Sequence, residues 1–392
     1  MISPQPPMEV PTPPRRVWLE IDLGLLTGNY RRIAAAVAPA QVMAVLKANA
    51  YGLGARPIAA ALTGAGVARF GVAEPYEALA LAGLGPPVQV LGAVLPEEIP
   101  VLVAADAVLP ATDLPIARRI AEEGRRQGRR VRVHVKIDTG MGRLGLLPGD
   151  AVDAIRAMAG LSGLDLEGIY THFPVAYRAG EAYTLRQIER FLALRETLAA
   201  AGLTFRLCHA ANSDAINNFP RAAQPPFNLV RTGINLHGSF DTEGQRRLQL
   251  RPVLALKTRL TAVRTLPAGT AIGYGLTCRL ARDTRVGTIS AGYADGLPLA
   301  LSNRGNVLVR GVPCPILGRL SMDYTTVSLD HAPDAAVGDE VTCLGGSGPN
   351  TITVEDWARA KGTNPYEIIC SFGNRVERRY VGAPLGMPSA CG

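Results

Sequence analysis

The feature that most limits the fold is a regular alternation of short apolar segments with Ala-rich segments of helical spacing. The apolar segments recur near residues 42–47, 70–73, 88–92, 107–109, 131–138, 167–172, 205–209 and 228–231. Between most of them lie stretches such as LPIARRIAEEGRRQG and LRQIERFLALRETLAAAG. Strands that alternate with helices form βαβ units and a parallel sheet. Eight such strands predict a closed (β/α)8 TIM-type barrel in the α/β class. An open doubly wound sheet remains the alternative.

The pattern changes after about residue 240 to β-rich segments with Gly and Pro turns, among them RVGTISAGYA and NVLVRGVPCPILG. We therefore predict a barrel over residues 17–245 and a second, mostly antiparallel β domain over residues 246–392. The alternating segment 17–23 precedes the barrel and is a candidate strand of the second domain. The proline-rich residues 1–16 predict a flexible leader.

Composition narrows the class of protein. With 47% hydrophobic and 19% charged residues the chain is expected to be globular, and it has no apolar run long enough to span a membrane. The N-terminus lacks the apolar core of a secretory signal, and six scattered cysteines without a CxxC pair predict free thiols in the cytoplasm and no metal site. A net charge of +8 without aromatic-interleaved basic patches favours an anionic ligand over nucleic acid.

Lys47 ends an apolar run in AVLKANAYGLG, four residues before Tyr51. A lysine at the carboxyl end of the first barrel strand is a candidate Schiff-base nucleophile if its surroundings lower its pKa. The alternative is a lysine whose stem packs on the strand end while its charge reaches water. His172, in EGIYTHF, ends another predicted strand and is a candidate site residue or a structural histidine.

The stretch VRVHVKIDTGMGRLG places His134, Lys136 and Asp138 on one face of a central strand, which predicts a polar barrel interior. Arg143 follows between glycines and is a candidate clamp for a carboxylate. The same stretch contains G-x-G-x-x-G over residues 140–145, the dinucleotide-binding pattern. It lacks the acid expected at the end of the next strand, and Pro148 is expected to delay the following helix.

The loops after the seventh and eighth strands are the usual phosphate site of this barrel. HAANSDA supplies Asn212 and Ser213 there, and NLVRTGINLHG supplies Arg231, Gly233 and Ile234. A hydroxyl group and backbone N–H groups are suitable donors for a phosphate.

Eight motifs together resemble, in order, the signatures of pyridoxal-phosphate-dependent alanine racemases of fold type III. They are AVLKANAYGLG, VKIDTGMGRLG, EGIYTHF, ANSDA, VRTGIN, GYGLT, SAGYADG and GRLSMD. The resemblance runs from about residue 17 to residue 385. It implies a barrel plus a β domain, pyridoxal 5'-phosphate as cofactor, and a homodimer in which the β domain completes the partner's active site.

The resemblance also implies roles for single residues. Lys47 and Tyr274 are expected to be acid/base groups on opposite faces of the substrate α-carbon, with Tyr274 from the partner. The expected cofactor contacts are Lys47, Tyr51, His172, Asn212, Ser213, Arg231, Gly233 and Ile234. The expected substrate contacts are Arg143 and Met322 of the partner, and the supporting residues are Lys136, Tyr293, Asp323 and Asn374. Lys136 matches a position that is often carbamylated in the family.

Two bases on opposite faces satisfy the chemistry of racemisation, which removes a proton from one face and delivers one to the other. We expect the cations His172 and Arg231 to lower the pKa of Tyr274. Asn374 stands where some family members have a larger tyrosine, so serine is a possible secondary substrate. The expected role is D-alanine biosynthesis for peptidoglycan in the cytoplasm. The alternatives are a serine or broad-specificity racemase, a fold-type III decarboxylase, a non-catalytic pyridoxal-phosphate carrier and a dinucleotide-dependent oxidoreductase.

Overall fold

The computed structural model describes residues 15–382; residues 1–14, most of the predicted leader, lie outside this range. Residues 20–254, 353–371 and 380–382 pack together as one compact unit, which we call the barrel unit. Residues 15–19, 255–352 and 372–379 form a second, the sheet unit. The chain thus leaves the barrel unit after residue 254 and returns to it for residues 353–371.

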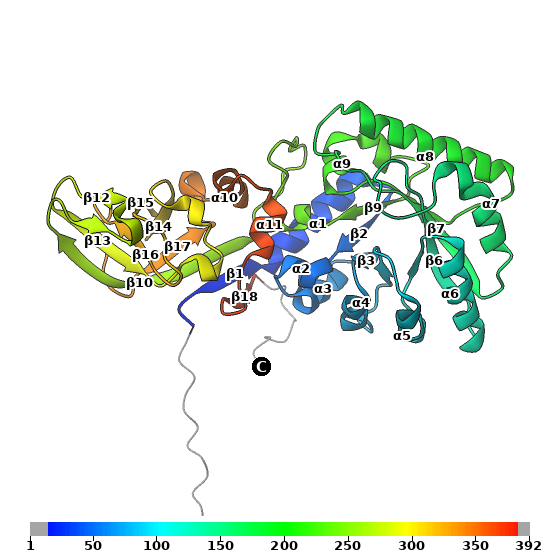
Figure 1. Cartoon of the computed structure of the whole chain (residues 1–392), viewed down its shortest axis with the longest axis horizontal. Coiled ribbons are helices and arrows are strands. Elements are labelled where there is room, and N and C mark those ends of the chain that lie inside the picture. Colours follow the sequence, from blue (N-terminus) through cyan, green and yellow to red (C-terminus); the bar gives the residue numbers. More distant parts are fainter. Residues whose placement is uncertain (1–14, 383–392) are drawn as a thin grey trace, which may run out of the picture. The chain divides into compact units, whose positions relative to one another are not determined.

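Eight parallel strands form the centre of the barrel unit (Figure 1). They are β2 (Gln41–Val45), β3 (Arg69–Val72), β4 (Val88–Val90), β5 (Leu109–Ala111), β6 (Val131–Lys136), β7 (Leu164–Tyr170), β8 (Leu207–His209) and β9 (Leu229–Thr232). Continuous ladders join them in two runs, β4-β3-β2-β9 and β5-β6-β7-β8.

Further hydrogen bonds close the two runs into a ring. Gln89 of β4 forms a parallel bridge with Val108 just before β5. Between β8 and β9, the Asn228 N–H donates to the Cys208 carbonyl at 3.1 Å, and the Arg231 N–H donates to the Ala211 carbonyl at 3.0 Å. The (β/α)8 barrel prediction is therefore confirmed, and the open doubly wound sheet is excluded.

Helices surround the strands of the barrel (Figure 1). The helices of this unit are α1 (Leu23–Val37), α2 (Lys47–Tyr51), α3 (Ala55–Gly64), α4 (Pro75–Leu81), α5 (Ile99–Ala104), α6 (Leu114–Arg126), α7 (Pro148–Ala159), α8 (Ala182–Ala200), α9 (Ser213–Asn218), α10 (Val354–Lys361) and α11 (Pro365–Cys370), with short 3-10 turns η1 (Pro96–Glu98), η2 (Pro220–Ala223) and η3 (Ile234–His237).

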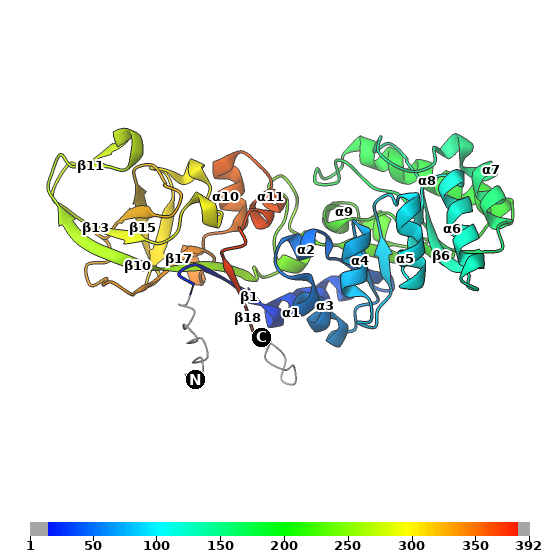
Figure 2. The same cartoon turned by 60° about the horizontal axis from the view of Figure 1, so that its bottom comes forward.

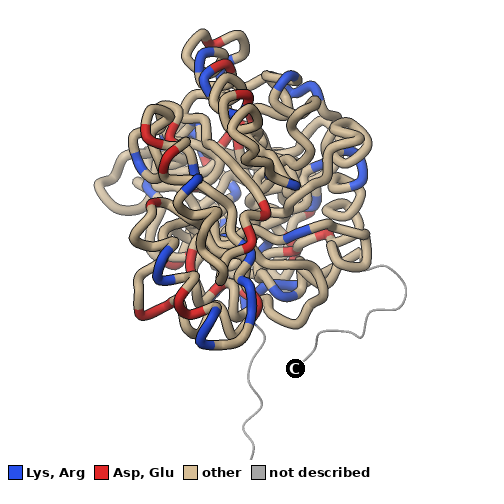
Figure 3. The backbone as a smooth tube through the Cα atoms, turned by 90° about the vertical axis from the view of Figure 1, so that its right-hand side faces the viewer, with Lys and Arg blue, Asp and Glu red and all other residues tan. Residues whose placement is uncertain are grey.

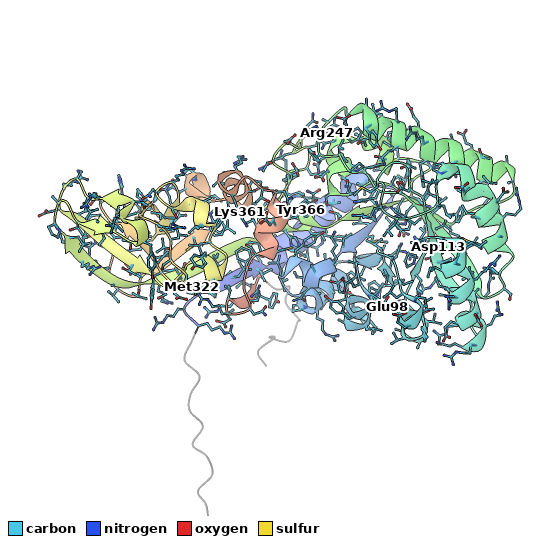
Figure 4. The ribbon with its side chains drawn as sticks, viewed as in Figure 1. Glu98, Asp113, Arg247, Met322, Lys361 and Tyr366 are labelled. Carbon is cyan, nitrogen blue, oxygen red and sulfur yellow. The ribbon has the colours of Figure 1, made fainter. Side chains whose placement is uncertain are left out.

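Local chemistry explains where these helices begin. Asp113, labelled in Figure 4, accepts the Ile116 N–H at 2.8 Å and caps α6. Pro148 is the first residue of α7, so the helix begins only after the Gly-rich loop, as expected. Proline suits this position because its missing N–H would have no partner within the helix, and its φ is already helical.

The sheet unit contains mostly antiparallel strands (Figure 2). The strand order of its main sheet is β13-β16-β15-β14-β17-β10-β1-β18, in which β1 lies beside β10. The strands are β1 (Trp18–Asp22), β10 (Leu254–Leu266), β13 (Thr284–Ile289), β14 (Asn306–Val309), β15 (Val312–Leu317), β16 (Thr325–Ser328), β17 (Glu340–Leu344) and β18 (Glu377–Val381), with a separate hairpin of β11 (Ala271–Ile272) and β12 (Cys278–Arg279). Four 3-10 turns complete it: η4 (Tyr274–Leu276), η5 (Tyr293–Asp295), η6 (Leu299–Leu301) and η7 (Gly348–Asn350).

Within the described residues, no helix is long and apolar enough to cross a membrane. Basic and acidic positions are interspersed along the backbone in the view of Figure 3. In a barrel of this kind the active site lies at the carboxyl ends of the strands, where residues from several strands meet.

Candidate active site

A cavity of about 550 Å³ lies at the carboxyl ends of the barrel strands. At least one predicted site residue comes from each of the strands β2, β6, β7, β8 and β9, or from the loop that follows the strand. Those that line it are Lys47, Tyr51, Lys136, Arg143, His172, Asn212, Ser213, Arg231 and Gly233. A cavity of this size accepts a small organic ligand.

The turn that carries Lys47 and Tyr51 has the opposite hand to an ordinary helix. Residues Ala48 to Tyr51 in α2 all have positive φ, between 52° and 60°. Such backbone costs about 1–2 kcal/mol per residue for residues other than glycine, and strain of this kind concentrates at functional sites. Of the four residues only Asn49 is a type that adopts this backbone readily, so contacts with the rest of the barrel unit must hold the turn.

Glu77 of α4 holds this turn, and the sequence did not reveal it. Its Oε1 accepts the Ala48 N–H, and its Oε2 accepts the N–H groups of Ala73 at 2.9 Å and Glu74 at 3.2 Å. The carboxylate is buried. One side chain therefore joins the loop after β3 to the turn that bears the lysine.

Lys47 opens onto the cavity and has no ion-pair partner among residues 15–382. Removal from bulk water lowers its pKa, and the positive charge of Arg143 lowers it further, against the opposing charge of Glu77. A lowered pKa provides the neutral amine that a nucleophile or base needs.

Arg143 sits on a loop that Asp138 organises. Asp138 Oδ1 accepts the N–H groups of Gly140, Met141 and Gly142 at 2.7–3.1 Å, and Oδ2 accepts the Arg143 N–H at 2.9 Å. Burial alone would raise the pKa of Asp138, but these four bonds outweigh it and lower the pKa. Because the loop's N–H groups already bind a carboxylate, they are not free for a pyrophosphate, and the dinucleotide interpretation of G-x-G-x-x-G is wrong.

Lys136 is buried, and its Nζ lies 4.7 Å from the centre of the Tyr170 ring. Burial, followed by the charges of Arg231 and Arg143, places its pKa well below the usual lysine range. A neutral amine at this position is chemically able to react with carbon dioxide, which would turn it into an anionic carbamate with release of a proton.

Arg231 is held by three firm hydrogen bonds. Its Nη1 donates to His209 Nδ1 at 2.7 Å, and its Nη2 donates to the carbonyls of Thr171 at 2.8 Å and Ala210 at 2.9 Å. His172 Nδ1 lies at 3.4 Å from the same Nη2. No carboxylate touches this guanidinium among the described residues.

The expectation that His172 is a cation is wrong. Burial, then the charges of Arg231, Lys136, Arg143 and Lys47, put its pKa well below the usual histidine value. A site that already holds this many positive groups disfavours another, so the imidazole is neutral at neutral pH.

Tyr51, Ser213 and Gly233 meet at one end of the cavity. Ser213 Oγ accepts the Gly233 N–H at 3.0 Å, and a Cβ at Gly233 would stand 1.9 Å from the Tyr51 hydroxyl oxygen. Asn212 caps α9 by accepting the Ala215 N–H at 2.9 Å, while the Ile234 side chain is buried and does not line the cavity. The two hydroxyl groups form a small polar corner of the kind that binds phosphate.

Two acids and a tyrosine near this corner were not expected from the sequence. Asp214, Asp241 and Tyr366, the last labelled in Figure 4, line the cavity. The Tyr366 ring centre lies 6.1 Å from that of Tyr51. Burial, with the charge of Asp241, raises the pKa of Asp214 to about 7. The only signal was an acid directly after Ser213 in ANSDA.

The remaining predicted residues belong to the sheet unit and line no part of this cavity. Tyr274 lies in η4 with 72% of its surface exposed, and Met322, labelled in Figure 4, is 52% exposed. Tyr293 is exposed, and Asp323 pairs with Arg375 at 2.7 Å. Asn374 lies in a separate hollow with Asp323 and Arg375.

This fold and site define a class: a barrel enzyme with an amine of lowered pKa in a basic pocket at the carboxyl ends of its strands. Comparison with known proteins makes the assignment specific. Residues 21–240 match the model of the alanine racemase N-terminal domain, and residues 253–380 match that of the C-terminal domain.

An alanine racemase of Desulforamulus reducens is 40% identical over 372 residues, which cover 93% of this chain and 99% of that protein. The crystal structure of alanine racemase from Streptomyces lavendulae has a TM-score of 0.87 and 34% identity, covering 95% of this chain and 98% of that one. The Bartonella henselae enzyme, solved with covalently bound pyridoxal phosphate, has a TM-score of 0.83 and 29% identity over 94% and 100% of the two chains. The chain belongs to the alanine racemase family and is an isomerase.

Proposed function

We propose that this protein interconverts L-alanine and D-alanine with pyridoxal 5'-phosphate as its cofactor. The observation that carries the proposal is the convergence of Lys47, Arg231 and the Tyr51–Ser213 corner on one cavity. Lys47 suits the aldehyde carbon of the cofactor, Arg231 its ring nitrogen, and the Tyr51–Ser213 corner its phosphate. When bound, the cofactor supplies an electron-withdrawing ring that acidifies the α-proton of an attached amino acid.

Tyr51, Ser213 and the Gly233 backbone would hold the phosphate, with Asn212 and the Ile234 backbone shaping the two loops. Lys47 would bind the cofactor covalently through its amine. Arg231 would face the ring nitrogen and, as a permanently protonated group, would give that nitrogen no proton. We expect this to limit side reactions, so Arg231→Glu should increase transamination products, and an unchanged product ratio would contradict this role.

The chain's own residues then divide the proton transfers. The Lys47 amine accepts or donates a proton on one face of the α-carbon, and the Tyr274 phenol of a second copy acts on the other. Tyr274 is supported by its exposure and by the resemblance that marks it. The homodimer is part of the proposal because the same resemblance assigns this tyrosine to the partner's active site.

Arg143 would bind the substrate carboxylate, together with the backbone N–H of Met322 from the second copy. Among residues 15–382 the Arg143 guanidinium has no hydrogen-bond partner, so it is free for this task. Carbamylation of Lys136 would place an anion beside it and orient it. Tyr293 and Asp323 would support the Met322 loop, since the Tyr293 N–H donates to Ser321 at 3.1 Å and Arg375 joins Asp323 to Asp295.

Shared active sites permit a sharp test. Lys47→Ala and Tyr274→Phe variants should each show a small fraction of native racemisation, followed by circular dichroism from either enantiomer. Mixing them after dissociation should restore about one quarter of native activity per chain, because half the dimers are mixed and one site in each is intact. Sites built from a single chain would show no recovery on mixing.

Cofactor binding has its own readout. The native protein should carry a visible absorbance band that borohydride removes, and Lys47→Ala should lack the borohydride-stable adduct. A carrier without catalysis would show the band but no racemisation, whereas a decarboxylase would release carbon dioxide from alanine.

Substrate range and cellular role are narrower proposals. Asn374, smaller than tyrosine, is proposed to admit serine as a secondary substrate. A serine kcat/KM below about one-thousandth of that for alanine would reject this. The product D-alanine would serve peptidoglycan synthesis in the cytoplasm, and a D-alanine requirement of a strain lacking the protein would test it.

A further inference from the structure

A continuous chain of hydrogen bonds runs through the barrel interior from Arg231 of β9 to Arg69 of β3. Arg231 Nη1 lies 2.7 Å from His209 Nδ1, and His209 Nε2 lies 2.8 Å from His134 Nδ1. His134 Nε2 lies 2.9 Å from Glu167 Oε2. Glu167 ends the chain in a two-bond pair with Arg69, at 2.7 Å and 2.9 Å.

All five side chains are buried, and their neighbours fix them in place. The His209 ring stacks on Tyr170 with centres 4.9 Å apart and planes 3° from parallel. A Cβ at Gly168 would stand 2.6 Å from the His134 ring, so only glycine allows that ring to lie against β7. These contacts and the hydrogen bonds at both ring nitrogens leave each imidazole little freedom to turn.

The direction of every hydrogen bond in this chain is determined by its ends. A guanidinium has donors only, so His209 Nδ1 must accept and its proton must lie on Nε2. That Nε2–H donates to His134 Nδ1, which places the His134 proton on Nε2 as well. The His134 Nε2–H then donates to the carboxylate of Glu167, which has acceptors only when ionised.

We propose that Glu167 and Arg69 are positioning residues that act through His134 and His209 to hold the Arg231 guanidinium against the cofactor ring. The inference rests on the proposed function, because it assumes that Arg231 faces the ring nitrogen. It assigns both histidines the neutral Nε2–H form. In this form each histidine accepts one hydrogen bond at Nδ1 and donates the next from Nε2, and neither transfers a proton.

The electrostatic surroundings agree with this assignment. Burial, then the charge of Arg231, places the pKa of His209 well below its usual value. Burial also lowers the pKa of His134, despite the opposing hydrogen bond to Glu167. Burial would raise the pKa of Glu167, but its bonds to His134 and Arg69 lower it to about 2. The residues at the two ends of this hydrogen-bond chain are therefore charged, and the two histidines between them are neutral.

The first test locates the protons in the native holoenzyme by neutron diffraction or by ¹⁵N NMR of labelled histidine. The expected result is an Nε2–H, Nδ1-unprotonated form for both His134 and His209. A proton on Nδ1 of either histidine would overturn the inference. This measurement requires no variant.

The second test uses the double variant Arg69→Met/Glu167→Gln, which removes both buried charges together and avoids an unpaired one. Its matched control is Arg132→Met/Asp106→Asn, which removes a 2.8 Å ion pair of the same barrel whose Asp106 side chain is 72% exposed. We expect the first variant to lose about tenfold or more in kcat, with KM for alanine within about twofold, and to shift the cofactor absorbance band. The control should change none of these.

Equal kcat, KM and absorbance in the two double variants would overturn the inference. A native protein without the borohydride-sensitive band would instead overturn the proposed function, and the histidine protons would still report on the chain. The two failures are therefore distinguishable.

Discussion

Glu77→Gln is the most informative single substitution, because one buried carboxylate holds the left-handed turn that presents Lys47. Four residues with positive φ store about 4–8 kcal/mol of backbone strain at about 1–2 kcal/mol each. Three backbone N–H groups donate to Glu77. Glutamine keeps the shape, but its NH₂ group must face at least one of these donors.

The magnitude follows from that lost acceptor. A hydrogen bond to a charged group contributes about 1.5–3 kcal/mol, and a buried N–H left unpaired adds a penalty of similar size. We therefore expect local destabilisation of about 2–4 kcal/mol. Amide hydrogen exchange at Ala48 should accelerate at least about 30-fold, and the Lys47-linked cofactor should dissociate more readily.

Glu98→Gln provides the matched control. Glu98, labelled in Figure 4, also accepts a backbone N–H three residues earlier, from Leu95 at 2.7 Å, but at an exposed position. Its substitution should change stability by no more than about 0.5 kcal/mol. If exchange at Ala48 in Glu77→Gln matches that in Glu98→Gln, the carboxylate does not hold the turn and the reasoning fails.

Three further predictions follow from single contacts. Asp138→Asn should raise the KM for alanine several-fold with a smaller change in kcat, because the amide NH₂ meets the Arg143 N–H; an unchanged KM would show that the loop keeps Arg143 in place by other means. Gly233→Ala should weaken cofactor binding by at least about tenfold in equilibrium dialysis, since its Cβ would collide with the Tyr51 hydroxyl. Native affinity in this variant would contradict the proposal that the Tyr51–Ser213 corner holds the phosphate. Glu167 has a pKa of about 2 in the folded protein, below its unfolded value of about 4.3. Its ionisation therefore contributes about 3 kcal/mol to the free energy of unfolding above about pH 4.3, and this contribution is lost as the pH falls toward 2. Acid unfolding of the Arg69→Met/Glu167→Gln variant should lack this pH-dependent contribution.

The sequence alone was sufficient for the architecture. Apolar segments at regular spacing, separated by amphipathic helices, specify eight parallel strands because each helix must bury its apolar face on the sheet. The β-rich segments after residue 240 predicted the second, mostly antiparallel β sheet. Ordered motifs around Lys47 and Arg231 were sufficient for the family, since such short segments carry their chemistry in adjacent residues.

Only the tertiary structure decided the states of these residues. Glu77 reaches the turn at Ala48 across 29 positions, and Glu167 reaches Arg69 across 98. His172 is neutral rather than cationic because burial and the neighbouring cations disfavour its charge. Protonation, hydrogen-bond direction and backbone handedness depend on which distant groups share a low-dielectric space, and a linear pattern of residue types does not contain that information.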